Sequence, residues 1–196
     1  MLILVRHGRT GINAGGRLQG RIDEPLDDLG QRQALATGEW VRARWDVSEI
    51  ISSPLIRAVD TARAIGPGIR IDDAFIELDY GDWDGMALAD VPKDEWRRWR
   101  SDPSLRPPNG ETLEELDTRV RPALETLAER ARLENIVIVS HVSPIKSAVT
   151  WALAAGPELT WRMSLDRASI CTVSIGPNGP ALASFNETAH LGDLRG

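Results

Sequence analysis

Two uninterrupted apolar runs dominate the hydrophobic pattern, one at residues 2–5 (Leu-Ile-Leu-Val) and one within residues 135–140 (Asn-Ile-Val-Ile-Val-Ser). Runs of this length are typical of strands that are buried on both faces of a parallel sheet. Weaker segments of the same kind predict four more strands, at 49–53, 69–71, 168–175 and 180–185. The last two flank the turn sequence Pro177-Asn178-Gly179, so we expect an antiparallel hairpin at one edge of the sheet.

Apolar residues at helical spacing occupy the segments between these strands. They predict helices at 28–45, 55–65, 94–101, 113–133 and 143–155. Thr112 opens the fourth helix in a capping box, and Ser143 is expected to cap the last one, with Pro144 in its first turn. Pro122 should kink or locally break the fourth helix. Three segments lack periodicity and are expected to be irregular: 9–25, 74–85 and 102–110.

Strands that alternate with helices indicate an α/β fold, because a helix must cross over between parallel strands. We therefore expect a three-layer α/β/α sandwich with a mainly parallel sheet and an antiparallel edge strand. No internal repeat and no shift in composition marks a boundary, so residues 1–196 are expected to form a single domain.

Composition narrows the class of protein and its partners. The 196 residues are 42% hydrophobic and 27% charged, which is an ordinary globular mixture. No apolar run approaches the length of a membrane span, and no basic segment leads into an apolar stretch, so neither a membrane anchor nor a signal peptide is expected. A net charge of −6 argues against a nucleic-acid partner. Cys171 is the single cysteine, which excludes an internal disulfide, and a cytosolic location is expected.

The chain contains three histidines, and His7 and His141 directly follow the two most apolar predicted strands. Parallel strands end at the same edge of a sheet, where open α/β folds bind their ligands. The two imidazoles can therefore converge although they lie far apart in the sequence. A lone histidine at a strand end is as often a hydrogen-bonded structural residue, but two out of three at this edge favour a shared site.

Arginines accompany both histidines. Arg6 precedes His7 at a buried strand end, where an unpaired charge is costly, and Arg57 lies in the first turn of a helix that follows another strand. Because a guanidinium group binds phosphate oxygens in pairs, these residues predict a phosphate pocket. A surface ion pair is the alternative for Arg57. For Arg9 and Arg17, solvated surface is favoured over a place at the rim of the pocket.

The remaining chemistry comes from the backbone and from a carboxyl group. Gly8 lets backbone amides approach an anion closely, and the amino end of the helix at Ser143 offers further donors. Neighbouring arginines disfavour protonation of His7, which suits a nucleophile that must be neutral when it attacks. A leaving alcohol needs a proton donor, for which a carboxyl group of raised pKa is suited. Glu77 is the candidate and Asp79 its competitor, and spacing alone does not choose between them.

Several motifs follow one another along nearly the whole chain: Arg6-His7-Gly8-x-Thr10 with Asn13, Leu18-Gln19-Gly20, Pro25-Leu26, Ser53-Pro54-Leu55-x-Arg57-Ala58-x-x-Thr61-Ala62, Glu77-x-x-x-Gly81-x-Trp83-x-Gly85, Gly110-Glu111-Thr112 and Val139-Ser140-His141. Together they resemble the histidine phosphatase superfamily, in its phosphoglycerate-mutase-like branch. An isolated Arg-His-Gly triplet would be a weak signal, whereas the ordered set is specific.

The resemblance implies a phosphohistidine at His7 and a general acid, later a base, at Glu77. The residues implied to bind the transferring phosphoryl group are Arg6, Arg57 and His141. Other residues expected on the phosphate or substrate side are Gly8, Asn13, Gln19, Gly20 and Val142. The resemblance implies neither a metal nor a cofactor, and a homodimer is suggested by it alone. The expected partner is a small phosphorylated substrate or inorganic phosphate.

Some positions depart from the family pattern. Position 9 is often Glu and here is Arg, and Val142 stands where many relatives have Gly, which makes the pocket wall bulkier. The segment from His141 to Lys146 resembles a variant seen in phosphatase domains of the α-ribazole-phosphatase-like kind. Lys146 either reaches a substrate anion or faces solvent.

We favour a phosphomonoester phosphatase, because residues 86–109 are short and rich in Trp, whereas mutases usually carry longer substrate-binding segments there. Phosphoglycerate-mutase-type transfer and a non-catalytic domain that binds phosphorylated ligands are the alternatives. Trp83, Trp96 and Trp99 either form an apolar wall over the site or pack in the core, and core packing is favoured for at least two of them.

Overall fold

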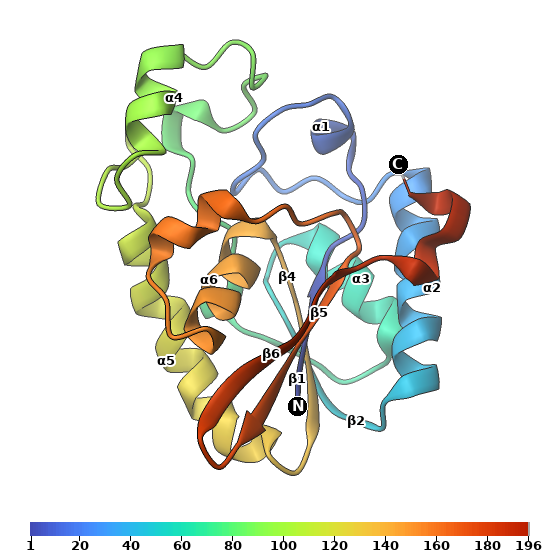
Figure 1. Ribbon diagram of the computed structural model, residues 1–196. Coiled ribbons are helices and arrows are strands. Elements are labelled where there is room, and N and C mark those ends of the chain that lie inside the picture. The colour runs from blue at the N-terminus through green and yellow to red at the C-terminus, as the bar shows by residue number, and fades with distance from the viewer. Residues whose placement is uncertain (196) are drawn as a thin grey trace.

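The computed structural model describes residues 1–195 and contains one six-stranded sheet in the order β3-β2-β4-β1-β5-β6 (Figure 1). The strands are β1 (Leu2–Arg6), β2 (Val47–Ser52), β3 (Ile69–Ile71), β4 (Asn135–Ser140), β5 (Ile170–Gly176) and β6 (Gly179–Glu187). The first four are mutually parallel where they pair, whereas β5 runs antiparallel to β1 and pairs with β6 as a hairpin. The predicted sheet with its antiparallel edge is confirmed.

Helices cover both faces of this sheet. They are α1 (Gly11–Ala14), α2 (Asp28–Arg44), α3 (Ile56–Ile65), α4 (Lys93–Trp99), α5 (Leu113–Ala131) and α6 (Val142–Ala152). Short 3-10 turns complete the chain: η1 (Asp73–Phe75), η2 (Gly81–Trp83), η3 (Pro157–Arg162) and η4 (Ala189–Leu194). Figure 1 shows α2 and α3 on one side of the sheet and α5 and α6 on the other, which is the predicted three-layer sandwich.

Alternate residues of the central strands supply two separate cores. Leu2 and Leu4 of β1 belong to the larger cluster, which contains the apolar faces of α5 and α6. Ile3 and Val5 belong to the cluster that contains α2 and α3. All four side chains are fully buried, and burial of each contributes about 1.5–3 kcal/mol. The apolar run at 2–5 is therefore continuous because both of its faces are covered.

Three local expectations require correction. A short helix, α1, interrupts the predicted loop at 9–25, because Thr10 and Asn13 form a capping box. The last helix begins at Val142 with His141 as its N-cap, so Ser143 does not cap it. Its first amides donate to a distant carboxylate instead. Helix α5 is continuous through Pro122, so of the two expected effects a local break is wrong.

The register of the sheet places the predicted site. Arg6 of β1 is paired with Ser140 of β4, so the residues that follow them, His7 and His141, leave the sheet at the same level. None of the described helices is long and apolar enough to cross a bilayer.

Candidate active site

The imidazoles of His7 and His141 face each other at the carboxyl edge of the sheet. Their ring centroids are 5.0 Å apart with an interplanar angle of 58°, and both side chains are buried. Their convergence follows from the parallel pairing of β1 with β4, as the sequence pattern predicted.

One hydrogen bond determines the tautomer of His7. Its Nδ1 lies 2.7 Å from the carbonyl oxygen of Gly8, and because a carbonyl can only accept, Nδ1 carries the proton. The lone pair is then on Nε2, which accepts from Nε of Arg57 at 3.3 Å. Burial, together with the charges of Arg57 and Arg6, holds the pKa of His7 well below its usual range. His7 is therefore a neutral base with its free nitrogen turned toward the other site residues.

His141 carries the opposite tautomer. Its Nδ1 accepts from the same Nε of Arg57 at 3.2 Å, and its Nε2 lies 2.7 Å from Oγ of Ser53. Burial and the charge of Arg57 also lower the pKa of His141 well below its usual range. The guanidinium Nε of Arg57 is thus shared between two neutral imidazoles.

The rest of the Arg57 guanidinium group holds the loop above the sheet edge. Nη1 donates to the carbonyl of Ile22 at 2.8 Å and Nη2 to the carbonyl of Gly20 at 2.7 Å. Arg57 is completely buried, so a surface ion pair is excluded. Nη1 and Nη2 were expected to bind two phosphate oxygens, but here they bind the loop backbone. Nε faces the two histidines.

Arg6 lies beside this group at the end of β1. Its Nη1 donates to the carbonyl of Leu165 at 2.5 Å, and its Nε is a buried donor without a partner among residues 1–195. Burial lowers the pKa of Arg6 to about 10, with the nearby Glu77 opposing the shift, so the group stays charged at neutral pH. A permanent cation therefore stands next to His7 with one unused N–H.

Glu77 supplies the carboxylate of the site and caps α6. Its Oε1 accepts from the amides of Leu78 at 2.7 Å and Ser143 at 3.1 Å, and its Oε2 accepts from the amide of Val142 at 3.1 Å. The buried carboxylate thus lies at the positive end of a helix dipole. Asp79, the competing acid, is partly exposed and pairs with Arg21 at 3.2 Å, so Glu77 is the buried carboxylate of the two.

Gln19 and Asn13 lie together on the loop over the sheet edge. Oε1 of Gln19 accepts from Oγ1 of Thr10 at 2.6 Å and from Nδ2 of Asn13 at 3.4 Å. Nε2 of Gln19 is buried and has no hydrogen-bond partner within the described chain. It is the second buried donor of the predicted site residues that no described residue uses, after Nε of Arg6.

The sequence of this chain is similar to those of a known protein family. A family model of the histidine phosphatase superfamily (branch 1) matches residues 2–188. The chain belongs to this superfamily. Phosphoserine phosphatase 1 of Hydrogenobacter thermophilus is 33% identical over 202 residues, which cover 98% of this chain and 95% of that protein.

A solved structure of this superfamily has nearly the same fold. The crystal structure of a phosphoserine phosphatase mutant from Entamoeba histolytica in complex with phosphoserine has a TM-score of 0.88 and 29% identity, and the match covers 97% of this chain and 98% of that one. A bifunctional protein of Mycobacterium tuberculosis is 33% identical over 198 residues, 97% of this chain. This chain spans 54% of that relative's length, about half.

Three backbone amides expected at the phosphate of a histidine phosphatase are already engaged. The amide of Gly8 donates to Oγ1 of Thr61 at 3.1 Å, that of Gly20 to Asp84 at 2.7 Å, and that of Val142 to Glu77. Gly8 is required by packing, because a Cβ there would lie 2.4 Å from the carbonyl oxygen of Gly30. The donors left for an anion belong to side chains.

The departures from the superfamily pattern have structural explanations. Arg9, where Glu is common, forms an ion pair with Asp27 at 2.7 Å and turns away from the histidines. Val142 contributes its amide to the Glu77 carboxylate, and any residue but proline can do that. Trp83 and Trp99 are buried in the core, as expected for two of the three tryptophans, whereas Trp96 lines a cavity.

Sequence reasoning missed one residue that contacts the predicted site, Ser53, and left the place of a second, Lys146, open. Ser53, which binds His141, directly follows β2 and could have been found by the rule that located the histidines. Lys146 is 9% exposed, not solvent-facing, and its ammonium has no hydrogen bond or ion pair with any described residue. Burial lowers the pKa of Lys146 to about 8, with Glu77 opposing the shift. A helical position within an apolar face gave no sequence signal for such a buried cation.

Proposed function

We propose that this chain hydrolyses phosphomonoesters of small metabolites through a phosphohistidine at His7. The observation that carries the proposal is the locked tautomer of His7. Its proton is held by the Gly8 carbonyl, and its Nε2 lone pair, which accepts only from Nε of Arg57 among the described residues, faces a site with two arginines. Attack by a nitrogen that is already neutral and oriented needs no prior deprotonation.

In the first step, Nε2 of His7 forms a bond to phosphorus while the bond from phosphorus to the ester oxygen breaks. The developing charge on the phosphoryl oxygens is stabilised by Arg6, Arg57 and the imidazole of His141. The unused donors Arg6 Nε and Gln19 Nε2 would satisfy two oxygens of the bound phosphate. No metal ion is needed for this charge balance in the proposed mechanism, because the arginines supply it.

Glu77 delivers a proton to the departing alkoxide, which leaves as an alcohol. Two amides occupy Oε1 of Glu77 and one occupies Oε2, so one lone-pair position of Oε2 can carry that proton. In the second step, the resulting carboxylate takes a proton from water as the water oxygen bonds to phosphorus. The bond to Nε2 of His7 breaks, and inorganic phosphate and the resting enzyme are regenerated.

Hydrolysis is favoured over mutase-type transfer by the short segment at 86–109 and by the names of two of the relatives, which are phosphoserine phosphatases. Incubation with 3-phosphoglycerate tests this choice. We expect net release of inorganic phosphate. Interconversion of phosphoglycerate isomers that depends on a bisphosphate primer, without phosphate release, would show a mutase instead.

The covalent step is tested by trapping. Rapid acid-free quenching of the enzyme with a ³²P-labelled phosphomonoester should yield label on protein that is stable in alkali and labile in acid, as expected for a phosphoramidate. The label should be absent from His7→Ala and present in His190→Gln, since His190 lies away from the site, next to Thr37 and Trp40. Turnover without any acid-labile label would contradict the mechanism. If no ester were turned over, the alternative of a non-catalytic domain that binds phosphorylated ligands would be favoured.

A further inference from the structure

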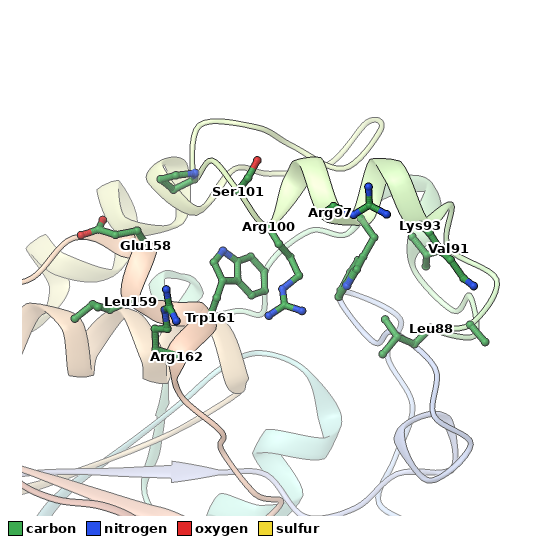
Figure 2. A pocket seen from close by; sticks show the side chains of 13 residues that line it. Leu88, Val91, Lys93, Arg97, Arg100, Ser101, Glu158, Leu159, Trp161 and Arg162 are labelled. Atoms are coloured by element: carbon green, nitrogen blue, oxygen red, sulfur yellow. The ribbon is translucent and has the colours of Figure 1, made fainter.

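A large cavity opens between α4 and η3, outside the pair of histidines. Its volume is about 850 Å³ (Figure 2). The residues used below are Leu88, Trp96, Arg100, Glu158, Trp161 and Arg162, all of which line it. We call it the cationic–aromatic cavity. Neither His7 nor His141 lines it, and Arg6 lines a separate cavity of about 410 Å³, so the larger cavity is not the phosphate pocket itself.

The charges around the cationic–aromatic cavity are strongly unbalanced. Its lining includes four cations, Lys93, Arg97, Arg100 and Arg162, against the single carboxylate of Glu158. Arg97 is neutralised by Asp94 at 3.2 Å, but Lys93 and Arg162 pair with no acid in the part of the chain that the structure describes. On a protein of net charge −6, this local excess of positive charge points to an anionic ligand.

Trp161 lies at the centre of these charges. Figure 2 shows the guanidinium groups of Arg100 and Arg162 on either side of its ring, and that of Arg100 lies 5.2 Å from the ring centroid. The indole Nε1 is a buried donor without a hydrogen-bond partner among the described residues. Two cations and an unused N–H can bind an acceptor group of a ligand, and the aromatic ring beside them can pack against the ligand's carbon skeleton.

Two contacts place the cavity beside the catalytic centre. The segment η3, which carries Arg162, ends three residues before Leu165, whose carbonyl accepts from Nη1 of Arg6 at 2.5 Å. The amide of Leu88 donates to the carbonyl of Gly16 at 3.1 Å, on the loop that carries Gln19. A molecule that places its phosphate at His7, next to Arg6, can therefore extend toward Arg162 and Arg100. Lys146, buried on α6, lies within electrostatic reach of Glu77, Arg6 and Arg100.

We propose that the cationic–aromatic cavity binds the far end of the substrate, and that this end carries a second anionic group, held by Arg100 and Arg162. This inference rests on the proposed phosphatase function and specifies its substrate class. Ligand sites of 300–1,000 Å³ enclose molecules well above three carbons in size. The substrate class is therefore a phosphomonoester that is larger than a three-carbon acid and has a second carboxylate or phosphate remote from the ester.

Two matched pairs of esters test the inference. 6-Phosphogluconate and glucose 6-phosphate have similar size and differ in a remote carboxylate. Adenosine 3′,5′-bisphosphate and adenosine 5′-monophosphate differ in a second phosphate. We expect the wild type to prefer the more anionic member of a pair by about 10-fold or more in kcat/KM, since a charge-assisted contact contributes on that scale. p-Nitrophenyl phosphate, which has no second anionic group, is the reference substrate.

The double variant R100Q/R162Q should abolish the preference and change kcat/KM for p-nitrophenyl phosphate by less than about twofold. The matched control is R63Q/R132Q, which also removes two exposed cations, but near the opposite edge of the sheet, where β3 and β4 begin. It should keep the preference. A preference that R100Q/R162Q retains, or that both double variants lose equally, would overturn the inference. Circular dichroism and thermal melting confirm that the variants are folded.

The outcomes separate the two proposals. A wild type that hydrolyses p-nitrophenyl phosphate but shows no preference within either pair overturns the inference and leaves the phosphatase function intact. A wild type that releases phosphate from no ester overturns the phosphatase function. In that case, calorimetric titration with 6-phosphogluconate decides: about 10-fold weaker binding to R100Q/R162Q supports the cavity assignment, and equal binding overturns it.

Discussion

The catalytic centre and the cationic–aromatic cavity differ in how their polar groups are held. At the centre, the imidazoles, the Arg57 guanidinium group and the Glu77 carboxylate are buried, and most of their hydrogen-bonding atoms are paired with backbone groups. In the cavity, the cations of α4, its C-cap Arg100 and η3 are exposed, and within residues 1–195 only Arg97 among them pairs with an acid. One region is preorganised by the sheet edge, and the other is formed by side chains of two short helical segments.

This difference separates two tasks. A preorganised centre stabilises a transition state without reorganisation, so its residues should affect every substrate alike. Exposed cations gain a partner only when a suitable ligand arrives, so their effect should depend on the substrate. The predictions below test this separation, and they begin with the residue on which all turnover depends.

Replacement of His7 should have the largest effect. We expect His7→Ala to reduce kcat for every phosphomonoester by at least about 10³-fold, because no covalent intermediate can form. Initial rates of phosphate release from p-nitrophenyl phosphate and from 6-phosphogluconate measure this loss. His190→Gln is the control and should keep both rates. A loss that differs strongly between the two substrates would contradict the separation of catalysis from selectivity.

Glu77→Gln should follow, with an effect that depends on the leaving group. Loss of a general acid costs about 10²–10⁴-fold for an alkyl ester. p-Nitrophenolate leaves without a proton, so its phosphorylation step should be less affected. The glutamine amide can replace only one carboxylate oxygen, which leaves one of the α6 amides without an acceptor and destabilises the fold by about 1–3 kcal/mol.

Measurement of both ester types with Glu77→Gln and with Asp79→Asn checks this assignment. Asp79 pairs with Arg21 at the surface, so Asp79→Asn should retain nearly full activity on alkyl and aryl esters. If Asp79→Asn were the more damaging change on alkyl esters, the general acid would be the other carboxylate. Equal losses in kcat/KM, which reports the phosphorylation step, on alkyl and aryl esters in Glu77→Gln would instead indicate a structural role.

The different origins of the two regions explain what the sequence could predict. His7 and His141 were predictable because an apolar run, a parallel register and a residue type combine into one geometric rule. Ser143 as a cap was not, because the amides of α6 bind a carboxylate about 65 positions away in the chain, and no local pattern records such a partner. Burial of Lys146 and the clustering of Arg100 with Trp161 likewise depend on tertiary packing between α4, α6 and η3.

Acidification should have the next largest effect. It should lower the stability of the protein through the histidines of the catalytic centre and not through the residues of the cavity. An unfolded histidine titrates near pH 6.5, whereas the pKa values of His7 and His141 lie well below it in the folded protein. Below pH 6.5 the unfolded chain therefore binds more protons, and stability falls by up to about 1.4 kcal/mol per pH unit for each histidine. Above pH 6.5 the two contribute no pH dependence.

Urea unfolding between pH 7.5 and 5 measures this slope. His141→Gln should remove part of the histidine contribution, because one of the three histidines with a lowered pKa is gone. R100Q/R162Q should leave the slope as it is in the wild type. A wild-type slope that His141→Gln does not change would show that other groups cause the acid sensitivity and that His141 already titrates normally in the folded chain.

Lys146 lies between the two regions, and its replacement should give the smallest effect, with opposite signs for stability and selectivity. Its pKa of about 8 means that the folded protein holds this proton less well than the unfolded chain does. Between about pH 8 and 10.5 the unfolded chain binds more protons, so wild-type stability should rise with pH across this window. At pH 7 the buried charge costs stability, and Lys146→Met should be more stable by about 1–3 kcal/mol.

Urea unfolding of the wild type, Lys146→Met and the exposed Lys93→Met at pH 7 and pH 10 isolates this contribution. Lys146→Met should lose the rise in stability with pH and Lys93→Met should keep it. If Lys146 guides the anionic end of a substrate toward Arg100, the stabilised variant should also bind 6-phosphogluconate less tightly while its rate with p-nitrophenyl phosphate changes little. Selectivity for anionic substrates would explain why the protein retains a buried cation at such a cost in stability. A Lys146→Met variant that is more stable and equally selective would show that Lys146 does not contribute to substrate selectivity.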